Sequence, residues 1–258
     1  MSAPELEIRW READDGSTHR PWLVFVHGIS TAAWVWDRWA GLAAARGWRS
    51  AAVSLRGHGD SAGYERLARW RIRDYVDDVR RVRDDLGEPA VLVGHSMGAI
   101  VVRRLLAERS VPAAVLVAPA GARHGAGITA LLARRRPWQL LRSLALRPLR
   151  FDASDQLSPV HPPPDADEIV ARLQDESPLV QLELALSPRP RGADDAPVLV
   201  LGAGSDRLVP PVETVRTARR YDGDCVMFAH MGHLMMLDTG WQAPATRMLD
   251  WLETRFGG

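Results

Sequence analysis

The sequence contains no lysine, so all 33 of its basic residues are arginine. A lysine amine forms the Schiff base with carbonyl substrates and pyridoxal phosphate, and it also binds the phosphates of a Walker-type nucleotide site. These kinds of site are therefore excluded. The 33 arginines are nearly balanced by 32 acidic residues, for a net charge of +1, and this balance argues against nucleic acid as a partner.

Cysteine and long apolar runs are also scarce. The chain has one cysteine, Cys225, so no disulfide can form within it, and the apolar neighbours Val226-Met227-Phe228 predict a buried, inert thiol. Residues 1–10 lack the apolar core of a signal peptide, and no apolar stretch is long enough to cross a bilayer. We expect a cytoplasmic protein that uses neither a cofactor nor a metal.

Length and periodicity predict one α/β core domain. A chain of 258 residues, 46% of them hydrophobic, can bury one large core. Most of its apolar runs are continuous rather than alternating, which indicates strands buried on both faces, and amphipathic helical patterns separate them. The expected strands are residues 5–10, 22–26, 50–55, 90–93, 113–118, 197–202 and 224–229, and the expected helices are 34–46, 70–86, 97–109, 212–221 and 244–255. The sequence thus predicts a doubly wound, mostly parallel sheet of seven to eight strands flanked by helices.

The alternation of strands and helices stops between residues 121 and 190. Helical patterns at 128–146 and 166–186 are separated there by the proline-rich segment 158–165. An insertion after a central strand lies over the carboxyl ends of the strands, where ligands bind in open α/β folds. We therefore expect residues 1–120 and 191–258 to form the core domain and residues 121–190 to form a helical lid.

The pentapeptide Gly94-His95-Ser96-Met97-Gly98 carries the clearest chemical signal. An apolar strand runs into it and an amphipathic helix leaves it, which places Ser96 at the apex of a sharp turn. Such a turn forces its central residue to positive φ and requires small residues two positions away on either side. We expect Ser96 to be a nucleophile, with its hydroxyl held in the open above the helix N-terminus.

A serine hydroxyl needs a base, and an imidazole oriented by a carboxylate supplies one near neutral pH. Only His230 and His233 follow the last expected strand, and His233 is favoured because Gly232 lets its loop approach the edge of the sheet. Asp206, after the sixth expected strand, is the expected acid, and its alternative role is to cap a helix or turn. The chain order Ser, Asp, His is the one expected after a nucleophile elbow.

Two backbone N–H groups are expected to bind the oxyanion, those of Met97 and Ile29. Met97 begins the helix after the nucleophile, and Ile29 follows His27-Gly28, where the glycine permits close approach of the backbone. The alternative is that His27 and Gly28 form an ordinary turn. We expect the His27 side chain to be a structural hydrogen-bonding group rather than a proton carrier. The candidate substrate-pocket residues are His27, Gly28, Trp34 and His95.

Together these segments resemble the α/β-hydrolase fold superfamily, in its serine-nucleophile branch of carboxylesterases and lysophospholipase relatives. The resemblance covers nearly the whole chain apart from the expected lid. Its motifs are, in order, His27-Gly28, Arg56-Gly57-His58-Gly59-Asp60-Ser61, the pentapeptide around Ser96, and Gly204-Ser205-Asp206 with Gly232-His233. It implies that Gly57, Gly59 and Ser61 brace the sheet and that His58 is not catalytic. It also implies eight strands, of which the first is here expected to be missing or short.

The resemblance implies a hydrolase that cleaves a small hydrophobic carboxylic ester through an acyl-enzyme intermediate. A serine at the elbow argues against the haloalkane dehalogenase and epoxide hydrolase branches, which place an aspartate there. Three alternatives stay open. One is a thioesterase acting on acyl-carrier or acyl-CoA thioesters, since the stand-alone editing type also carries a G-H-S-M-G elbow. The others are a non-hydrolytic lyase or cyclase and a ligand-binding module.

Two further groups of side chains each have two interpretations. Trp34, Trp36 and Trp39, beside the expected oxyanion loop, either line an acyl pocket or pack in the core. The arginines that alternate with leucines in the expected lid either form a solvated face or meet an anionic partner, such as a carrier protein or a lipid surface. These arginines are Arg134, Arg135, Arg136, Arg142, Arg147 and Arg150.

Overall fold

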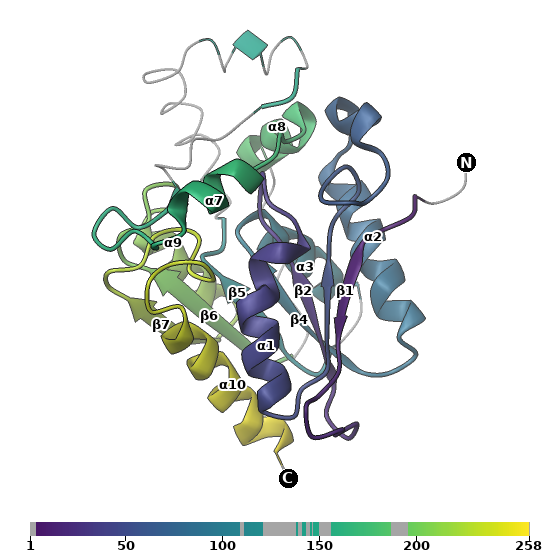
Figure 1. Ribbon diagram of the computed structural model, residues 1–258, viewed down its shortest axis with the longest axis vertical. Helices are drawn as coiled ribbons and strands as arrows, with labels where there is room; N and C mark the ends of the chain where they lie inside the picture. Colours follow the sequence, from purple (N-terminus) through teal and green to yellow (C-terminus); the bar gives the residue numbers. More distant parts are fainter. Residues whose placement is uncertain are drawn as a thin grey trace.

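A computed structural model of the chain describes residues 4–108, 111–120, 138, 141–142, 145, 147–149, 156–186 and 196–257. The strands in these residues form one seven-stranded sheet of order β1-β3-β2-β4-β5-β6-β7, in which only β1 is antiparallel (Figure 1). The strands are β1 (Ile8–Arg11), β2 (Trp22–Val26), β3 (Ser50–Val53), β4 (Ala90–His95), β5 (Ala114–Val117), β6 (Val198–Ala203) and β7 (Asp224–Phe228). The predicted fold class is confirmed, with seven strands. The first of them, β1, has four residues, as do β3 and β5.

Helices cover both faces of the sheet. Side chains of α1 and α10 pack in one core cluster, while those of α2, α3 and α9 pack in the other, on the opposite face (Figure 1). The helices are α1 (Asp37–Ala45), α2 (Ile72–Asp85), α3 (Met97–Leu106), α7 (Ala166–Arg172), α8 (Pro178–Leu186), α9 (Pro211–Arg220) and α10 (Gln242–Phe256), with short 3₁₀ helices η1 (Ala33–Trp36) and η2 (Tyr64–Arg69). A sheet covered in this way explains why the strands read as continuous apolar runs.

Successive strand residues enter opposite cores, as the two-residue repeat of a strand requires. Val24 belongs to the core under α2 and α3, and Phe25 belongs to the core under α1 and α10. Trp36 and Trp39 are fully buried in the second of these, where Trp36 stacks on Phe25 with ring centroids 4.9 Å apart. For these two tryptophans the structure therefore shows core packing.

The edge strand β7 departs from the sequence prediction. Cys225 is exposed there, whereas its apolar neighbours predicted a buried thiol. The reason is that, among the strands that the structure describes, β7 pairs with β6 alone and lies at the margin of the sheet, where neighbouring elements cover it less completely. The partial burial that remains raises the pKa of the Cys225 thiol above its ordinary value.

The described part of segment 121–190 lies at the carboxyl ends of the strands, with α7 and α8 beyond that end of the sheet (Figure 1). The helical pattern predicted over 166–186 is two helices, α7 and α8, separated by residues 173–177. The segment contacts loops that follow β2 and β7. The N–H of Gln174 donates to the carbonyl oxygen of Ser30 at 2.8 Å, and the N–H of Leu234 donates to that of Gln156 at 3.0 Å.

Most of the predicted helix 128–146 lies outside the described residues. Arg134, Arg135, Arg136 and Arg150 lie outside them as well. Arg142 and Arg147 are exposed, and the guanidinium of Arg142 donates to the carbonyl oxygen of Pro148 at 3.2 Å. The predicted arginine face of the segment and its anionic partner stay predictions.

Candidate active site

The turn around Ser96 has the backbone that its sequence requires. Ser96 lies between β4 and α3 with φ 52° and ψ −112°, in the positive-φ region that the prediction specified. A Cβ on Gly94 would lie 2.5 Å from the carbonyl oxygen of Gly98, and a Cβ on Gly98 would lie 2.4 Å from that of Val26. Both positions therefore require glycine because the neighbouring backbone leaves no space for a side chain.

Ser96 is buried rather than held in the open. It is 4% exposed, so the prediction of an open hydroxyl is wrong. The reason is that other loops close over the turn: a Cβ on Gly28 would lie 3.1 Å from the Cβ of Ser96. The N–H of Ser96 also donates to the carbonyl oxygen of Val117 at 3.0 Å, which ties the turn to β5. Ser96 therefore lies below the protein surface.

Three side chains that are distant in sequence meet at the turn. The Nδ1 atom of His233 lies 2.7 Å from Oδ2 of Asp206, and its Nε2 atom lies 2.8 Å from Oγ of Ser96. An ionised carboxylate can only accept, so Nδ1 carries the hydrogen and donates to Asp206, which leaves Nε2 to accept from the Ser96 hydroxyl. The side chains of His233 and Asp206 are almost fully buried, so little water competes for these hydrogen bonds.

Asp206 makes the contacts that each of its two expected roles requires. Its Oδ2 faces His233, while its Oδ1 accepts the backbone N–H groups of Leu208 and Val209, both at 2.8 Å. The carboxylate is therefore held by its own loop while it orients the imidazole. His230, the alternative base, is exposed, and its carbonyl oxygen accepts the hydroxyl of Ser158. Of the two histidines, His233 is the one that contacts Ser96.

The loop after β2 lies against the turn. Gly28 has no space for a side chain, since a Cβ there would lie 2.6 Å from Nδ1 of His95. Ile29 is buried in this loop, and the next residue, Ser30, has a φ of 59°. Met97 is the first residue of α3, so its N–H has no partner within the helix. The backbone groups expected to bind an oxyanion thus belong to two segments, the start of α3 and the loop after β2, whose Gly28 lies against Ser96.

His27 holds this loop in place as a neutral ring. Its Nδ1–H donates to the carbonyl oxygen of Gly28 at 2.7 Å, and its Nε2 accepts the N–H of Leu55 at 3.0 Å. Burial, together with the charge of His58, lowers the pKa of His27 to about 3. The ring is therefore uncharged at neutral pH, and it makes the structural hydrogen bonds that the sequence analysis expected.

His95 and Trp34 were candidate pocket residues. His95 is buried, and its Nε2–H donates to the carbonyl oxygen of His233 at 2.9 Å, so the ring joins β4 to the loop of His233. Burial and then the charge of His233 hold the pKa of His95 well below its usual value. Trp34 is buried in the core cluster that contains α1, and the guanidinium carbon of Arg172 lies 4.0 Å from its ring centroid. The contributions of His95 and Trp34 to a substrate pocket stay predictions.

Two buried carboxylates beside the site were missed by sequence reasoning. Asp238 accepts the N–H groups of Gly232 at 2.5 Å and Ser158 at 3.1 Å, and thereby joins the His233 loop to segment 121–190. Burial raises the pKa of Asp238. Glu176 lies within that segment, and its Oε2 is 3.2 Å from Nε2 of His58. Neither residue belongs to a recognisable motif. The sequence feature that could have pointed to a buried Asp238 is the apolar run at residues 234–237, which it directly follows.

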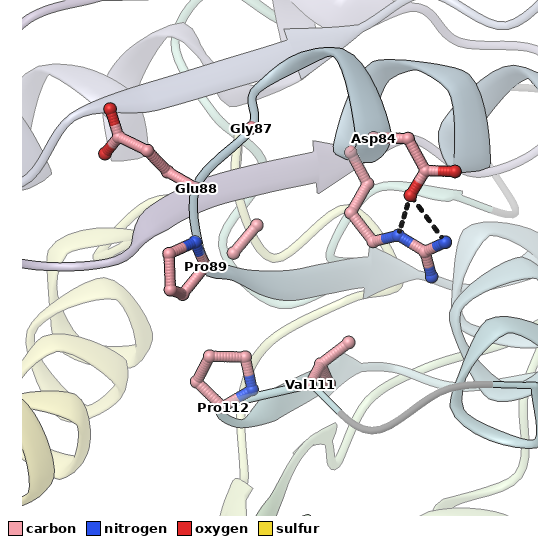
Figure 2. Close-up of a pocket in the computed structure, with 8 residues that line it drawn as sticks. Asp84, Gly87, Glu88, Pro89, Val111 and Pro112 are labelled. Atoms are coloured by element: carbon pink, nitrogen blue, oxygen red, sulfur yellow. Dashed lines mark hydrogen bonds and ion pairs between the residues drawn. The ribbon is translucent and has the colours of Figure 1, made fainter.

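No group of three or more His, Cys, Asp or Glu side chains among the described residues is arranged to hold a metal ion. A cavity of about 410 Å³ lies at the other end of the sheet (Figure 2). Its lining residues are Arg83, Asp84, Gly87, Glu88, Pro89, Ala90, Val111 and Pro112. They precede or begin β4 and β5, whereas Ser96 follows β4, at a distance of roughly 20 Å along an extended strand. This cavity is separate from the triad of Ser96, His233 and Asp206.

Known proteins resemble this chain in sequence and in fold. The sequence matches the family described as "Alpha/beta hydrolase family" over residues 23–246. The structure is similar to that of a monoacylglycerol lipase from Paleococcus ferrophilus, with a TM-score of 0.76 and 21% identity over 97% of this chain and 99% of that chain. It is also similar to that of a monoglyceride lipase from Saccharomyces cerevisiae, with a TM-score of 0.82 and 14% identity over 99% and 94% of the two chains.

A curated relative matches a shorter stretch. Epoxide hydrolase B of Mycobacterium tuberculosis (strain ATCC 25618 / H37Rv) is 37% identical over 82 residues, which are 31% of this chain and 23% of the relative. The match thus spans less than a quarter of that protein's length. Among the described residues of this chain, no helix is both long enough and apolar enough to cross a membrane.

Proposed function

The chain belongs to the alpha/beta hydrolase family, and on this premise we propose that it is a serine hydrolase that cleaves a carboxylic ester. The observation that carries the proposal is the unbroken contact from Asp206 through His233 to Ser96. A hydroxyl bonded to an oriented imidazole is activated for attack on a carbonyl carbon. An ester with a small hydrophobic acyl group is the proposed substrate.

The proposed reaction begins with attack of Ser96 Oγ on the ester carbonyl while its proton passes to Nε2 of His233. Asp206 stabilises the imidazolium that forms, and the N–H groups of Met97 and Ile29 bind the oxyanion. Collapse of the tetrahedral intermediate expels the alcohol, which takes the proton from Nε2. Water then attacks the acyl-enzyme by the same steps, which releases the acid and restores Ser96.

Segment 121–190 is proposed to act as a lid over this site, with residues 1–120 and 191–258 as the core domain. Its described part supports this role because it bonds to the loop of Ser30 and to the loop between His230 and Asp238, which contains His233. The burial of Ser96 also fits a site that is covered. The arginines of the segment are proposed to meet an anionic carrier or a lipid surface.

Epoxide hydrolysis is not the activity that we propose, although a curated relative bears that name. The match to it covers less than a third of this chain. Residue 96 is a serine whose hydroxyl contacts His233, and such a hydroxyl serves acyl transfer.

The decisive experiment is labelling with a fluorophosphonate probe, followed by hydrolysis of a short p-nitrophenyl ester. The probe should label the wild type and the control Ser17→Ala, whose serine precedes β2 at the other end of the sheet, but not Ser96→Ala. Labelling and ester hydrolysis should both be lost with Ser96.

Each other outcome of this experiment would overturn the proposal. A wild type that takes no label but binds a hydrophobic small molecule would be a ligand-binding module. Labelling without ester cleavage would favour a lyase or cyclase. A large preference for acyl-carrier or acyl-CoA thioesters over p-nitrophenyl esters would make the protein a thioesterase.

A further inference from the structure

A buried ion pair lies behind the loop of the proposed oxyanion donor. His58 and Glu176 are both fully buried, and Nε2 of His58 lies 3.2 Å from Oε2 of Glu176. The other oxygen of Glu176 accepts the hydroxyl of Tyr75 at 2.9 Å and the N–H of Ser177 at 2.7 Å. Burying two charged groups costs free energy because both lose their hydration. Removing one partner of such a pair therefore leaves the other charge buried and unpaired.

Segment 121–190 is also joined to the core loops through Gln174, two residues before Glu176. The N–H of Gln174 donates to the carbonyl oxygen of Ser30, and its side-chain oxygen accepts the N–H of Gly59, both at 2.8 Å. Ser30 directly follows Ile29. A movement of Glu176 would therefore be transmitted over a few bonds to the backbone of Ile29.

The same pair also reaches this loop through the histidine rings. The ring of His58 packs on that of His27, with centroids 5.1 Å apart, and His27 donates to the carbonyl oxygen of Gly28. The carbonyl oxygens of Gly28 and Ser30, on either side of Ile29, are thus both held by groups that depend on the pair. Hydrogen-bond donors stabilise an oxyanion most strongly when their positions are already fixed before the reaction begins.

We propose that Glu176 and His58 are positioning residues for the N–H of Ile29: the ion pair holds residues 174–177 against the core and so fixes the loop that binds the oxyanion. The inference rests on the proposed function, in which Ile29 is an oxyanion donor. It explains why a fully buried acid of segment 121–190 is placed against the motif at residues 56–61. Burial is the largest single influence on His58 and would by itself lower its pKa. The charge and hydrogen bond of Glu176, together with the carbonyl group of Arg56 and the charge of Asp78, outweigh burial and raise the pKa, which favours the imidazolium that the pair needs.

The test replaces Glu176 by glutamine, which keeps the size and one acceptor oxygen but removes the charge. We expect kcat for a p-nitrophenyl ester to fall about tenfold with KM nearly unchanged, as for a weakened oxyanion contact. Backbone amide exchange of residues 27–32 should become faster. Tyr75→Phe is the matched control because it removes a hydrogen bond to the same carboxylate and leaves the ion pair, so it should lower the melting temperature without changing kcat or this exchange.

A double-mutant cycle covers the case in which Glu176→Gln folds poorly, since the variant His58→Gln/Glu176→Gln leaves no unpaired buried charge. If the two residues acted independently and each single variant lost about tenfold in kcat, the double variant would lose about a hundredfold. If they act through one ion pair, the double variant should lose about tenfold or less. Unchanged exchange over residues 27–32 in Glu176→Gln, or an equal loss of kcat in Tyr75→Phe, would overturn the inference. The exchange measurement needs no catalysis, so it separates this inference from a failure of the proposed ester hydrolysis.

Discussion

Replacing Asp206 by asparagine should invert the tautomer of His233 while leaving the site folded. The two backbone N–H groups of Leu208 and Val209 point at Oδ1, so they hold the amide oxygen on their side. The amide NH₂ then replaces Oδ2 and donates to Nδ1 of His233, which moves the imidazole hydrogen to Nε2. A protonated Nε2 cannot accept the proton of Ser96. A wrong tautomer of this kind costs about 10⁴-fold in kcat, or about 5.5 kcal/mol.

Asp206→Ala is the comparison that separates orientation from capping. It leaves two N–H groups without their acceptor, at about 1 kcal/mol each. For a chain of this size, about 2 kcal/mol lowers the melting temperature by roughly 4–8 °C. Asp206→Asn should melt close to the wild type because its oxygen keeps both bonds. The assay is ester hydrolysis together with a thermal melt of each variant.

An Asp206→Asn protein that retained more than about a tenth of wild-type kcat would refute this reasoning, because tautomer control would then be unimportant. A melt of Asp206→Asn as low as that of Asp206→Ala would show that the amide oxygen does not take over the two N–H bonds.

The remaining predictions concern the oxyanion loop and the buried ion pair. Gly28→Ala should lower kcat/KM by about a hundredfold or more, as the loss of an oxyanion donor does. The reason is that the new Cβ would lie 2.6 Å from Nδ1 of His95 and would push the loop away from Ser96. Steady-state kinetics would contradict this prediction if kcat/KM stayed near the wild-type value. The raised pKa of His58 means that the ion pair stabilises the fold fully below about pH 6.5, the unfolded pKa, and that this contribution is lost as pH rises through the folded pKa. Urea unfolding should therefore show a larger loss of stability between pH 6 and pH 9 for the wild type than for His58→Gln, and equal losses would speak against a charged pair.

Local sequence was a good guide wherever a short segment sets its own geometry. The apolar runs predicted β2 to β6, since a strand buried on both faces needs apolar residues throughout. The edge strands β1 and β7 were also predicted, although they are largely exposed. The turn at Ser96 was predictable because its backbone requires positive φ and glycine neighbours whatever surrounds it. The choice of His233 over His230 rested on an adjacent glycine, and the structure places His233 in contact with Ser96.

Burial was predicted less well, because it depends on what packs from elsewhere. Cys225 lies in an apolar run but is exposed, since β7 is the edge of the sheet. Ser96 was expected in the open but is covered by the loop of Gly28, which is 68 residues earlier in the chain. The hydrogen bond from the His95 ring to the backbone of His233, 138 residues later, was likewise not predictable from the local sequence.

The sequence by itself determined the order of the elements, the strained turn and the residue types that can perform acyl transfer, because each follows from a few neighbouring residues. The tertiary structure decided which distant groups meet: that Asp206 serves the imidazole and its own loop together, and that Glu176 and Asp238 bond to loops beside the triad. A buried carboxylate is tolerated only where partners from other segments satisfy it, and no local pattern specifies those partners.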